Sequence, residues 1–185
     1  MDDHQINCLI ERCRKNDTKA FRFLVEHYQQ MIFQLAFRLL GDEEDAKDIV
    51  QETFIKSWLS IESYNPDFRF STWLYKIAWN TCQDLQRKRK YLLNFGEEEW
   101  KIAYDRLSSG DNIEHDLINQ DLRKLILTFT QELTPKQKLV FILKDLEEME
   151  VNEIGTVSGL TPTQIKSNLY LARKHIRRKL EEMEN

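Results

Sequence analysis

Glycine and proline are both scarce in this chain of 185 residues, with five glycines and three prolines. A β-sandwich or β-barrel needs many tight turns, which these two residues supply, so an all-β fold is disfavoured. The sequence also lacks an apolar run of about 20 residues, the length that crosses a bilayer as a helix. The first residues do not form a basic region followed by an apolar stretch. We therefore expect a cytoplasmic protein without membrane insertion.

Cysteine is equally sparse, because Cys8, Cys13 and Cys82 form an odd set without a Cys-x-x-Cys pair. This spacing favours free thiols over a disulfide framework. A metal site built from His4, Cys8 and Cys13 is the weaker alternative. The sequence shows no nucleophile–base pair, metal-ligand set or phosphate-binding loop, so we expect no bound metal, no cofactor and no enzymatic activity.

The net charge of −4, taken alone, argues against a protein that binds DNA unaided. The charges are, however, unevenly distributed. The segments 84–90 and 162–180 are rich in lysine and arginine, whereas the intervening segment 96–118 is rich in aspartate and glutamate. The chain thus carries two basic patches joined by an acidic stretch.

Apolar residues recur at three- and four-residue steps through most of the first half of the chain, which is typical of amphipathic helices. Asp17 or Thr18 can cap the second of these helices, and Gly41 can end it. Asp42 can cap the third, and Ser71 or Thr72 the fourth. We expect helices over about 5–15, 18–40, 43–59 and 73–89. The pattern predicts a compact bundle of about four helices over 1–92.

Periodicity is lost over 93–118, which we interpret as a flexible acidic linker. It returns at Asp116, and Thr134-Pro135-Lys136-Gln137 forms the capping sequence of a further helix. A second bundle is expected over 119–185. The predicted fold class is therefore all-α, with two small helical bundles joined by a linker.

The second bundle ends in a helix-turn-helix pattern, with a short helix at about 151–157, a turn at Ser158-Gly159-Leu160 and a capped basic helix. The second helix would enter the major groove of DNA and meet phosphates further along. The plainer alternative is a helical hairpin with a solvated basic face. The residues expected at the DNA are Thr163, Gln164, Lys166, Ser167, Asn168, Tyr170, Arg173, Lys174 and Arg177.

Two features of the first bundle also suit binding. Acidic and amide residues share one face of the helix over 43–59, and such a face can dock a basic partner, although spacing alone favours an ordinary solvated face. Aromatic and basic residues adjoin one another over 61–90, which suits unstacked bases. A place in the core is the favoured alternative for Phe70 and Trp73. Asn80 suits a base contact because its amide both donates and accepts hydrogen bonds.

Two motifs carry a family resemblance. Asp45-Ala46-x-Asp48-Ile49-x-Gln51-Glu52-x-Phe54, followed by Phe70-x-Thr72-Trp73-Leu74-x-x-Ile77-Ala78-x-Asn80, resembles regions 2.2 to 2.4 of extracytoplasmic-function sigma factors of the sigma-70 family. Leu133-Thr134-Pro135-Lys136-Gln137 through Glu153-Ile154, with Lys166-Ser167-x-Leu169 and Ala172-Arg173, resembles region 4. The match covers about 20–91 and 120–180, and the two motifs occur in the order typical of the family.

The resemblance implies a sigma factor that joins core RNA polymerase and directs promoter-specific transcription initiation. The helix over 43–59 would bind the β′ clamp helices through Asp45, Asp48, Ile49, Gln51, Glu52, Phe54 and Trp58. The −10 element would be recognised and opened by Tyr64, Phe68, Arg69, Lys76, Asn80, Arg87, Lys88, Arg89 and Lys90. The last helix would read the −35 element. The β flap and an anti-sigma factor are the other expected partners.

Some positions depart from the family pattern: Asn168 and Leu171 stand where Arg is frequent, and Gly155 stands where Ala is frequent. These departures leave the −35 sequence open. Two other functions also remain open. A free-standing helix-turn-helix regulator would bind paired half-sites about 34–36 Å apart without polymerase. The partners of a protein-binding helical adaptor would be indifferent to substitution at Lys166, Arg173 or Asn80.

Overall fold

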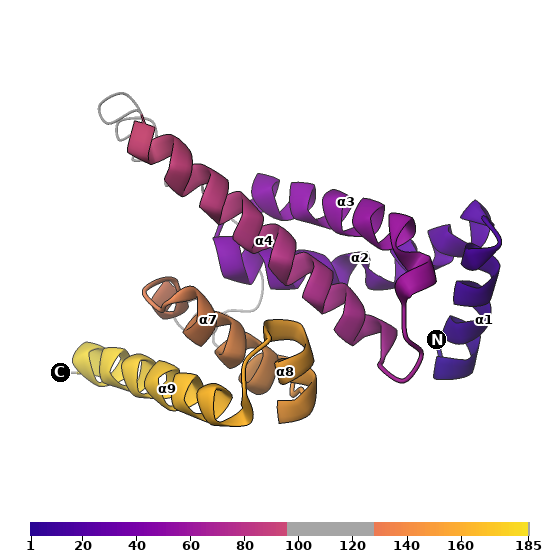
Figure 1. Ribbon diagram of the computed structural model, residues 1–185. Coiled ribbons are helices and arrows are strands. Elements are labelled where there is room, and N and C mark those ends of the chain that lie inside the picture. Colours follow the sequence, from indigo (N-terminus) through magenta and orange to yellow (C-terminus); the bar gives the residue numbers. More distant parts are fainter. Residues whose placement is uncertain (96–127, 185) are drawn as a thin grey trace.

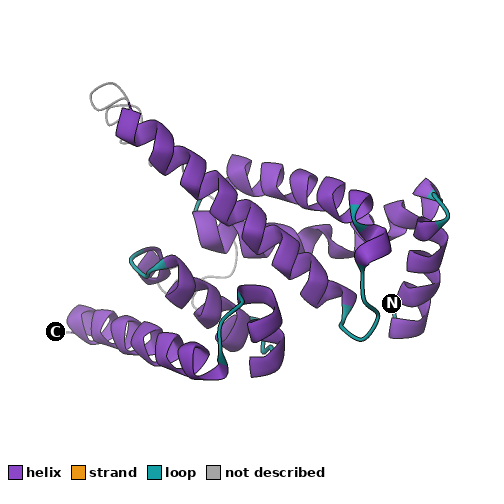
Figure 2. Cartoon of the chain, viewed as in Figure 1, coloured by secondary structure: helices purple, strands orange, loops and turns teal. Residues whose placement is uncertain are grey.

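The computed structural model describes residues 1–95 and 128–184, whose regular elements are all helical (Figures 1 and 2). The predicted all-α class is confirmed. The expected linker, from residue 96 on, and the helical stretch from Asp116 to 127 lie outside the described residues. In the part that is described, no helix is both long enough and apolar enough to cross a membrane. The elements are α1 (Asp3–Arg14), α2 (Thr18–Leu40), α3 (Glu43–Leu59), η1 (Ile61–Ser63), α4 (Phe70–Phe95), α7 (Pro135–Phe141), η2 (Ile142–Leu146), α8 (Val151–Ser158) and α9 (Pro162–Glu184).

Helix α2 is the centre of the N-terminal half, where it packs against α1, α3 and α4. Leu24, Ile32 and Leu35 are fully buried along it, at the spacing that keeps side chains on the covered side of a helix. The predicted caps of α2 are confirmed. The Asp17 carboxylate accepts from two backbone amides, and Gly41 ends the helix at a φ of +77°.

Helix α4 differs from its prediction at both ends. It begins at Phe70, and the Trp73 amide already donates to the Arg69 carbonyl oxygen at 3.2 Å. The prediction of a cap at Ser71 or Thr72 is therefore wrong. The Thr72 hydroxyl instead donates to Glu153 of α8 at 3.3 Å. The helix also continues to Phe95, so the first residues of the expected linker are helical.

The C-terminal half begins its helices with local caps, as predicted. Thr134 and Gln137 form a reciprocal capping box at α7, and Thr161 and Gln164 form the same pair of bonds at α9. Gly159 ends α8 at a φ of +71°. Helices α7 and α9 pack together, and α8 packs on both. This arrangement holds α8 and α9 as a helix-turn-helix.

The two halves also pack on each other, a contact that the sequence does not predict. Helix α8 lies against α4, and α7 lies near the end of α2 (Figure 1). We call these two contacts the domain seam. Buried residues on both sides of the seam belong to one continuous apolar cluster, which contains Leu74 and Ala78 of α4 together with Ile154 and Val157 of α8. The N- and C-terminal bundles thus share a core.

Polar groups at the seam are paired across it. Glu147 accepts from Arg38 of α2 and from the Tyr75 hydroxyl of α4, the latter at 2.8 Å. Lys138 of α7 is buried, and its ammonium donates to the Leu39 carbonyl oxygen at 3.1 Å, at the C-terminal end of α2. The ammonium is therefore placed where the helix dipole favours a cation.

The titration of Lys138 predicts a pH dependence of stability. Burial lowers its pKa from 10.5 to about 8. Between these values the unfolded chain binds more protons than the folded chain, so the contribution of Lys138 to the free energy of unfolding rises with pH. We expect the stability of the wild type relative to Lys138→Met to increase from about pH 8 to 10.5. Urea unfolding of both proteins across this range measures the difference. Lys136→Met, at an exposed position, is the control, and a constant difference for Lys138→Met would contradict the prediction.

Candidate protein- and nucleic-acid-binding surfaces

Helix α3 presents an exposed stripe that is acidic at one end and apolar at the other. Asp48, Glu52, Ile55 and Leu59 follow one another at four-, three- and four-residue steps, and all four are exposed. Ile55 is 60% exposed and Leu59 is 78% exposed, which is unusual for large aliphatic side chains. We call these four residues the α3 stripe. Its chemistry suits a partner that offers both basic and apolar groups.

The apolar members of the predicted polymerase-binding set do not lie on this surface. Ile49 is 1% exposed and Phe54 is 6% exposed, so both belong to the core. Trp58 is half-buried, and its ring lies 5.0 Å from that of Phe21. Ile49 and Phe54 therefore hold α3 in place, whereas Trp58 packs against the core and stays partly exposed. The predicted set does not include the exposed Ile55 and Leu59, although their spacing from Asp48 and Glu52 is visible in the sequence.

Gln51 and Asp45, two further residues of the predicted polymerase-binding set, differ in their exposure to solvent. Gln51 is exposed beside the stripe. The side chain of Asp45 is only 13% exposed and accepts from Arg89 of α4 at 2.6 Å. This ion pair joins the first turn of α3 to the basic end of α4. Asp45 therefore already has a partner within the chain.

The residues of α4 that were predicted to contact the −10 element are all exposed. Lys76 and Asn80 are exposed and lie four residues apart, so their side chains share one face. Further along, the basic run is exposed as predicted, although Arg87 pairs with Asp84 at 2.7 Å. The amide of Asn80 has room to approach a base, and the exposed basic residues beyond it can contact phosphates. The exposed residues of that run are Arg87, Lys88, Arg89 and Lys90.

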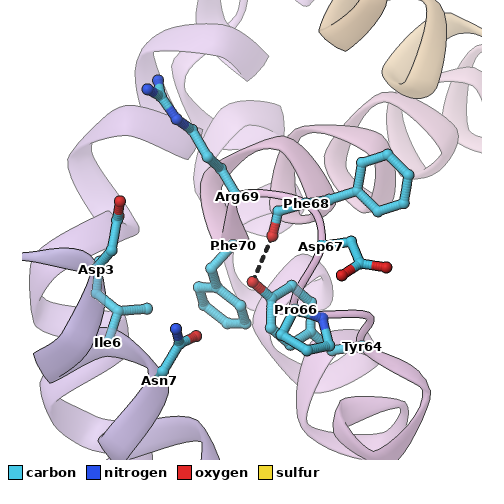
Figure 3. A pocket seen from close by; sticks show the side chains of 9 residues that line it. All are labelled: Asp3, Ile6, Asn7, Tyr64, Pro66, Asp67, Phe68, Arg69 and Phe70. Atoms are coloured by element: carbon cyan, nitrogen blue, oxygen red, sulfur yellow. Dashed lines mark hydrogen bonds between the residues drawn. The ribbon is translucent and has the colours of Figure 1, made fainter.

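A cavity of about 300 Å³ lies between α1 and the loop that precedes α4 (Figure 3). The loop contributes Phe68 and Arg69, which are both exposed. Tyr64 is buried and its hydroxyl donates to the Phe68 carbonyl oxygen at 2.6 Å, so Tyr64 shapes the loop. Burial also raises the pKa of Tyr64, which keeps the phenol protonated as a donor. The volume is at the lower end of the range for small-ligand pockets.

The opposite wall of this cavity comes from α1, which no motif had assigned to a site. Asp3 and Asn7 lie one helical turn apart and line the cavity, facing the loop across it (Figure 3). Their side-chain oxygens can accept hydrogen bonds from an exocyclic amino group, and the Asn7 amide can also donate. The sequence held no signal for this wall, because the two sides are about sixty residues apart along the chain. Phe70, expected in the core, is buried at 3% exposure.

Helix α9 turns its basic face outward and its apolar face inward. Ile165, Ala172 and Ile176 are buried, in agreement with the helix-turn-helix pattern. Tyr170 is 65% exposed and Leu171 is 45% exposed, so both reach solvent on the outer side. The other predicted DNA-binding residues that are exposed along this helix are Thr163, Gln164, Lys166, Ser167, Arg173, Lys174 and Arg177.

Three of the predicted −35 residues already have partners within the chain. The Asn168 amide donates to the Gln164 carbonyl oxygen at 2.8 Å. The Gln164 side-chain oxygen accepts from the Thr161 amide in the cap, which leaves its amino group for other contacts. Arg173 donates twice to Asp145, at 2.9 and 2.5 Å, and this carboxylate raises the pKa of the guanidinium. Lys166 and Ser167 are therefore the better placed residues for base contact.

The thiols match the expectation of free cysteines. Cys13 and Cys82 are each 1% exposed, and burial raises their pKa to about 11 and about 12. Both therefore stay protonated and unreactive near neutral pH. Among the described residues, no group of three or more His, Cys, Asp or Glu side chains is arranged to hold a metal ion.

The burial pattern of α3 yields a matched pair of substitutions. Ile49→Ala removes a core side chain, so we expect it to lower the free energy of unfolding by about 2–5 kcal/mol. Ile55→Ala truncates an exposed side chain on the same helix, and we expect a change of about 0.5 kcal/mol or less. Urea unfolding followed by circular dichroism measures both. Equal losses in the two variants would show that the exposed stripe has been misassigned.

Comparison with known proteins places the chain in a family. The model of "Sigma-70 region 2" matches residues 24–91, and that of "Sigma-70, region 4" matches residues 123–176. The ECF RNA polymerase sigma factor SigW of Bacillus subtilis is 31% identical over 179 residues, covering 94% of this chain and 96% of SigW. The ECF RNA polymerase sigma-E factor of Haemophilus influenzae is 30% identical, covering 94% of each chain.

Solved structures support the fold over both halves. The sigma factor RpoE from Bartonella quintana, in complex with the anti-sigma factor NepR, matches with a TM-score of 0.70 and 20% identity, covering 88% of this chain and 98% of RpoE. CnrH, in complex with the cytosolic domain of CnrY, matches with a TM-score of 0.69 and 22% identity, covering 98% of this chain and 99% of CnrH. These likenesses agree with the fold, and the family models and the curated relatives show that the chain belongs to the extracytoplasmic-function sigma factors of the sigma-70 family.

Proposed function

We propose that the α3 stripe is the surface through which this sigma factor binds the β′ clamp helices of core RNA polymerase. Family membership assigns the chain to promoter-specific initiation with that enzyme. The α3 stripe supports this particular contact because it combines carboxylates with two exposed aliphatic side chains in one line. Interfaces that bind specifically combine apolar and polar contacts, and Ile55 and Leu59 would supply the apolar part beside the two carboxylates.

The exposed strip of α4 and the cavity beside it would recognise the −10 element. Lys76 and the basic end of the helix would follow phosphates, and Asn80 would contact a base. A base that leaves the duplex needs a pocket with polar groups at its edge. The cavity between α1 and the loop offers Asp3, Asn7 and Arg69 as such groups.

The outer face of α9 would read the −35 element in the major groove. Lys166 can donate to guanine, and Ser167 can contact any base pair. Leu171 stands on this face and can offer an apolar contact to a thymine methyl group, which an arginine there would not provide. Lys174 and Arg177 would contact phosphates further along the helix. The C-terminal half would also contact the β flap.

An anti-sigma factor is a further proposed partner. The solved structures of RpoE and CnrH each contain a second protein, named in the first case as an anti-sigma factor. The exposed apolar residues of the α3 stripe would need cover in the absence of polymerase, and such a partner could supply it. Work with polymerase also implies a cytoplasmic location. A free-standing regulator is not favoured, because both halves match the family and the α3 stripe would then lack a role.

The polymerase contact predicts a charge effect on α3. Reversal of Asp48 and Glu52 to lysine opposes the basic partner surface, so we expect binding to core polymerase to weaken tenfold or more without loss of the fold. Glu26→Lys is the control, because Glu26 and Glu52 each form an exposed pair with a basic residue four positions away. Fluorescence anisotropy with core enzyme measures the affinity, and circular dichroism checks the fold. Equal affinities for reversal and control would refute the placement.

The promoter contacts predict losses of transcription. Core polymerase and this protein are incubated with genomic DNA from the source bacterium, and the run-off transcripts are sequenced. We expect discrete start sites that depend on the protein. Asn80→Ala and Lys166→Ala should each lower their yield about 10-fold, given about 1–3 kcal/mol per base contact.

The control for the promoter contacts is Lys19→Ala, which removes an exposed lysine on α2. It should leave the yield unchanged. If the wild type produced no protein-dependent start sites while folded, the proposed function would fail. If Lys19→Ala lowered the yield as much as Lys166→Ala did, the base contacts would be misplaced.

A further inference from the structure

One wall of the cavity beside the loop that precedes α4 lies outside the segment that matches the region 2 model. The model begins at residue 24, whereas α1 ends at Arg14. Asp3, Ile6 and Asn7 of α1 line the cavity, and the other lining residues belong to 64–70. The match to the family model therefore assigns no role to the α1 wall.

Several contacts hold the loop against α1. The Arg14 guanidinium, at the end of α1, donates to the Tyr64 carbonyl oxygen at 2.7 Å. The Tyr64 hydroxyl in turn donates to the Phe68 carbonyl oxygen, which closes the loop on itself. Ile6 and Phe70 are buried and supply the apolar part of the cavity lining. The two walls are thus held together by contacts that need no ligand.

The polar side chains of the cavity divide into paired and unpaired groups. Tyr64 is bonded within the loop, and so is Asp67, whose carboxylate accepts from a side-chain amide two residues away at 3.2 Å. Within the part of the chain that the structure describes, no hydrogen bond or ion pair engages the side chains of Asp3, Asn7 or Arg69. All three are exposed. They are therefore the groups that a ligand in the cavity would meet.

The space between the walls is open to a ligand. Asp3 and Asn7 stand one helical turn apart on α1, and Phe68 turns its ring away from them (Figure 3). The charge of Asp3 adds to the effect of burial in raising the pKa of Tyr64, so this carboxylate lies close to the loop wall. A ligand between α1 and the loop would therefore contact the Asp3 carboxylate.

Charge determines which part of a nucleic acid strand can enter. Asp3 and Asp67 place two carboxylates at the cavity, and these repel a phosphate. The basic run at the end of α4 suits phosphates instead. The volume of about 300 Å³ is at the lower end of the range for small-ligand pockets, which suits one flat base. A single strand would therefore enter base first.

The donors of each base decide which one this wall selects. Guanine presents a ring N–H and an amino group side by side, whereas adenine and cytosine present an amino group alone and thymine a ring N–H alone. The Asp3 carboxylate can accept from both guanine donors at once. The Asn7 oxygen can accept the remaining amino hydrogen, and Arg69 can donate to O6 and N7. Guanine therefore uses all three unpaired groups.

We infer that this cavity binds one unstacked guanine of single-stranded DNA, which Asp3 and Asn7 of α1 select. The inference rests on the proposed −10 role of the loop and names the base that the loop would receive. It also adds α1 to the elements that determine promoter specificity.

Oligonucleotides with one guest base test this assignment on the full chain without polymerase. The host is a fluorescein-labelled run of about 12 thymidines, and its central base is replaced by guanine, adenine, cytosine or hypoxanthine. At low salt the basic residues retain the strand whatever the guest. Fluorescence anisotropy should show the guanine strand bound about tenfold more tightly than the host. Hypoxanthine, which differs from guanine by the missing amino group, should bind less tightly than guanine.

Matched substitutions on α1 show whether this wall selects the base. Asp3→Ala should weaken binding of the guanine strand about tenfold and leave the host strand almost unchanged. Asn7→Ala should weaken the guanine strand to a smaller extent. His4→Ala and Cys8→Ala, which alter the exposed residues next in sequence, should change neither affinity. A purely structural effect would alter all strands alike, and circular dichroism checks the fold.

Equal affinities for the guanine and host strands in the wild type would overturn the inference, as would a guanine preference that survives Asp3→Ala. Tighter binding of the adenine or cytosine strand would overturn the choice of base. Displacement of the guanine strand by free deoxyguanosine at low concentration would assign the cavity to a free guanine compound and overturn the DNA assignment.

The outcome is independent of the polymerase experiments. If protein-dependent start sites were found and the guanine preference were absent, this inference alone would fail. If the guanine preference were found and start sites were absent, the proposed function would fail and the base selectivity of the cavity would stand.

Discussion

Helix α4 is packed against α2 and α3 on one side and against α8 on the other. This packing determines which of its residues remain available for binding. Leu74 and Ala78 are fully buried, and Tyr75 and Trp79 are buried as well. The hydroxyl of Tyr75 lies in the seam, bound to Glu147. A helix that is covered on both sides keeps only a narrow exposed strip, on which Lys76 and Asn80 lie. The strip is therefore held on a rigid support, which suits a residue that has to distinguish bases.

Helix α3 differs from α4 in that it exposes two large aliphatic side chains to solvent. Ile55 and Leu59 stay in solvent although Phe54, next to Ile55 in the sequence, is buried. Helical periodicity separates them, since residues one apart lie on different faces. An exposed aliphatic pair has no benefit for the isolated molecule, and it is best explained by a partner that covers it.

Most local signals were read correctly from the sequence, and contacts between distant segments were not. The caps at Asp17, Thr134 and Gly159 depend on neighbours within a few residues, so the pattern alone predicts them. Thr72 resembled a cap, but its hydroxyl bonds to Glu153, 81 residues away. The cavity beside α1 and the domain seam join equally distant segments. Ile49 and Phe54 were assigned to a surface because the family motif includes core positions as well as contact positions.

The acidic net charge and a DNA-binding role are compatible because the basic residues are partly neutralised within the chain. Arg173 is paired with Asp145, and Arg89 with Asp45. The two arginine side chains are half exposed, whereas the carboxylates of Asp145 and Asp45 are only 20% and 13% exposed, so a phosphate that took either arginine would leave a shielded carboxylate without its partner. We therefore expect the free protein to gain little from a single exchange of this kind. Under the proposed function, polymerase would hold both halves on one promoter, so both exchanges could occur together and raise the affinity for DNA without any new side chain.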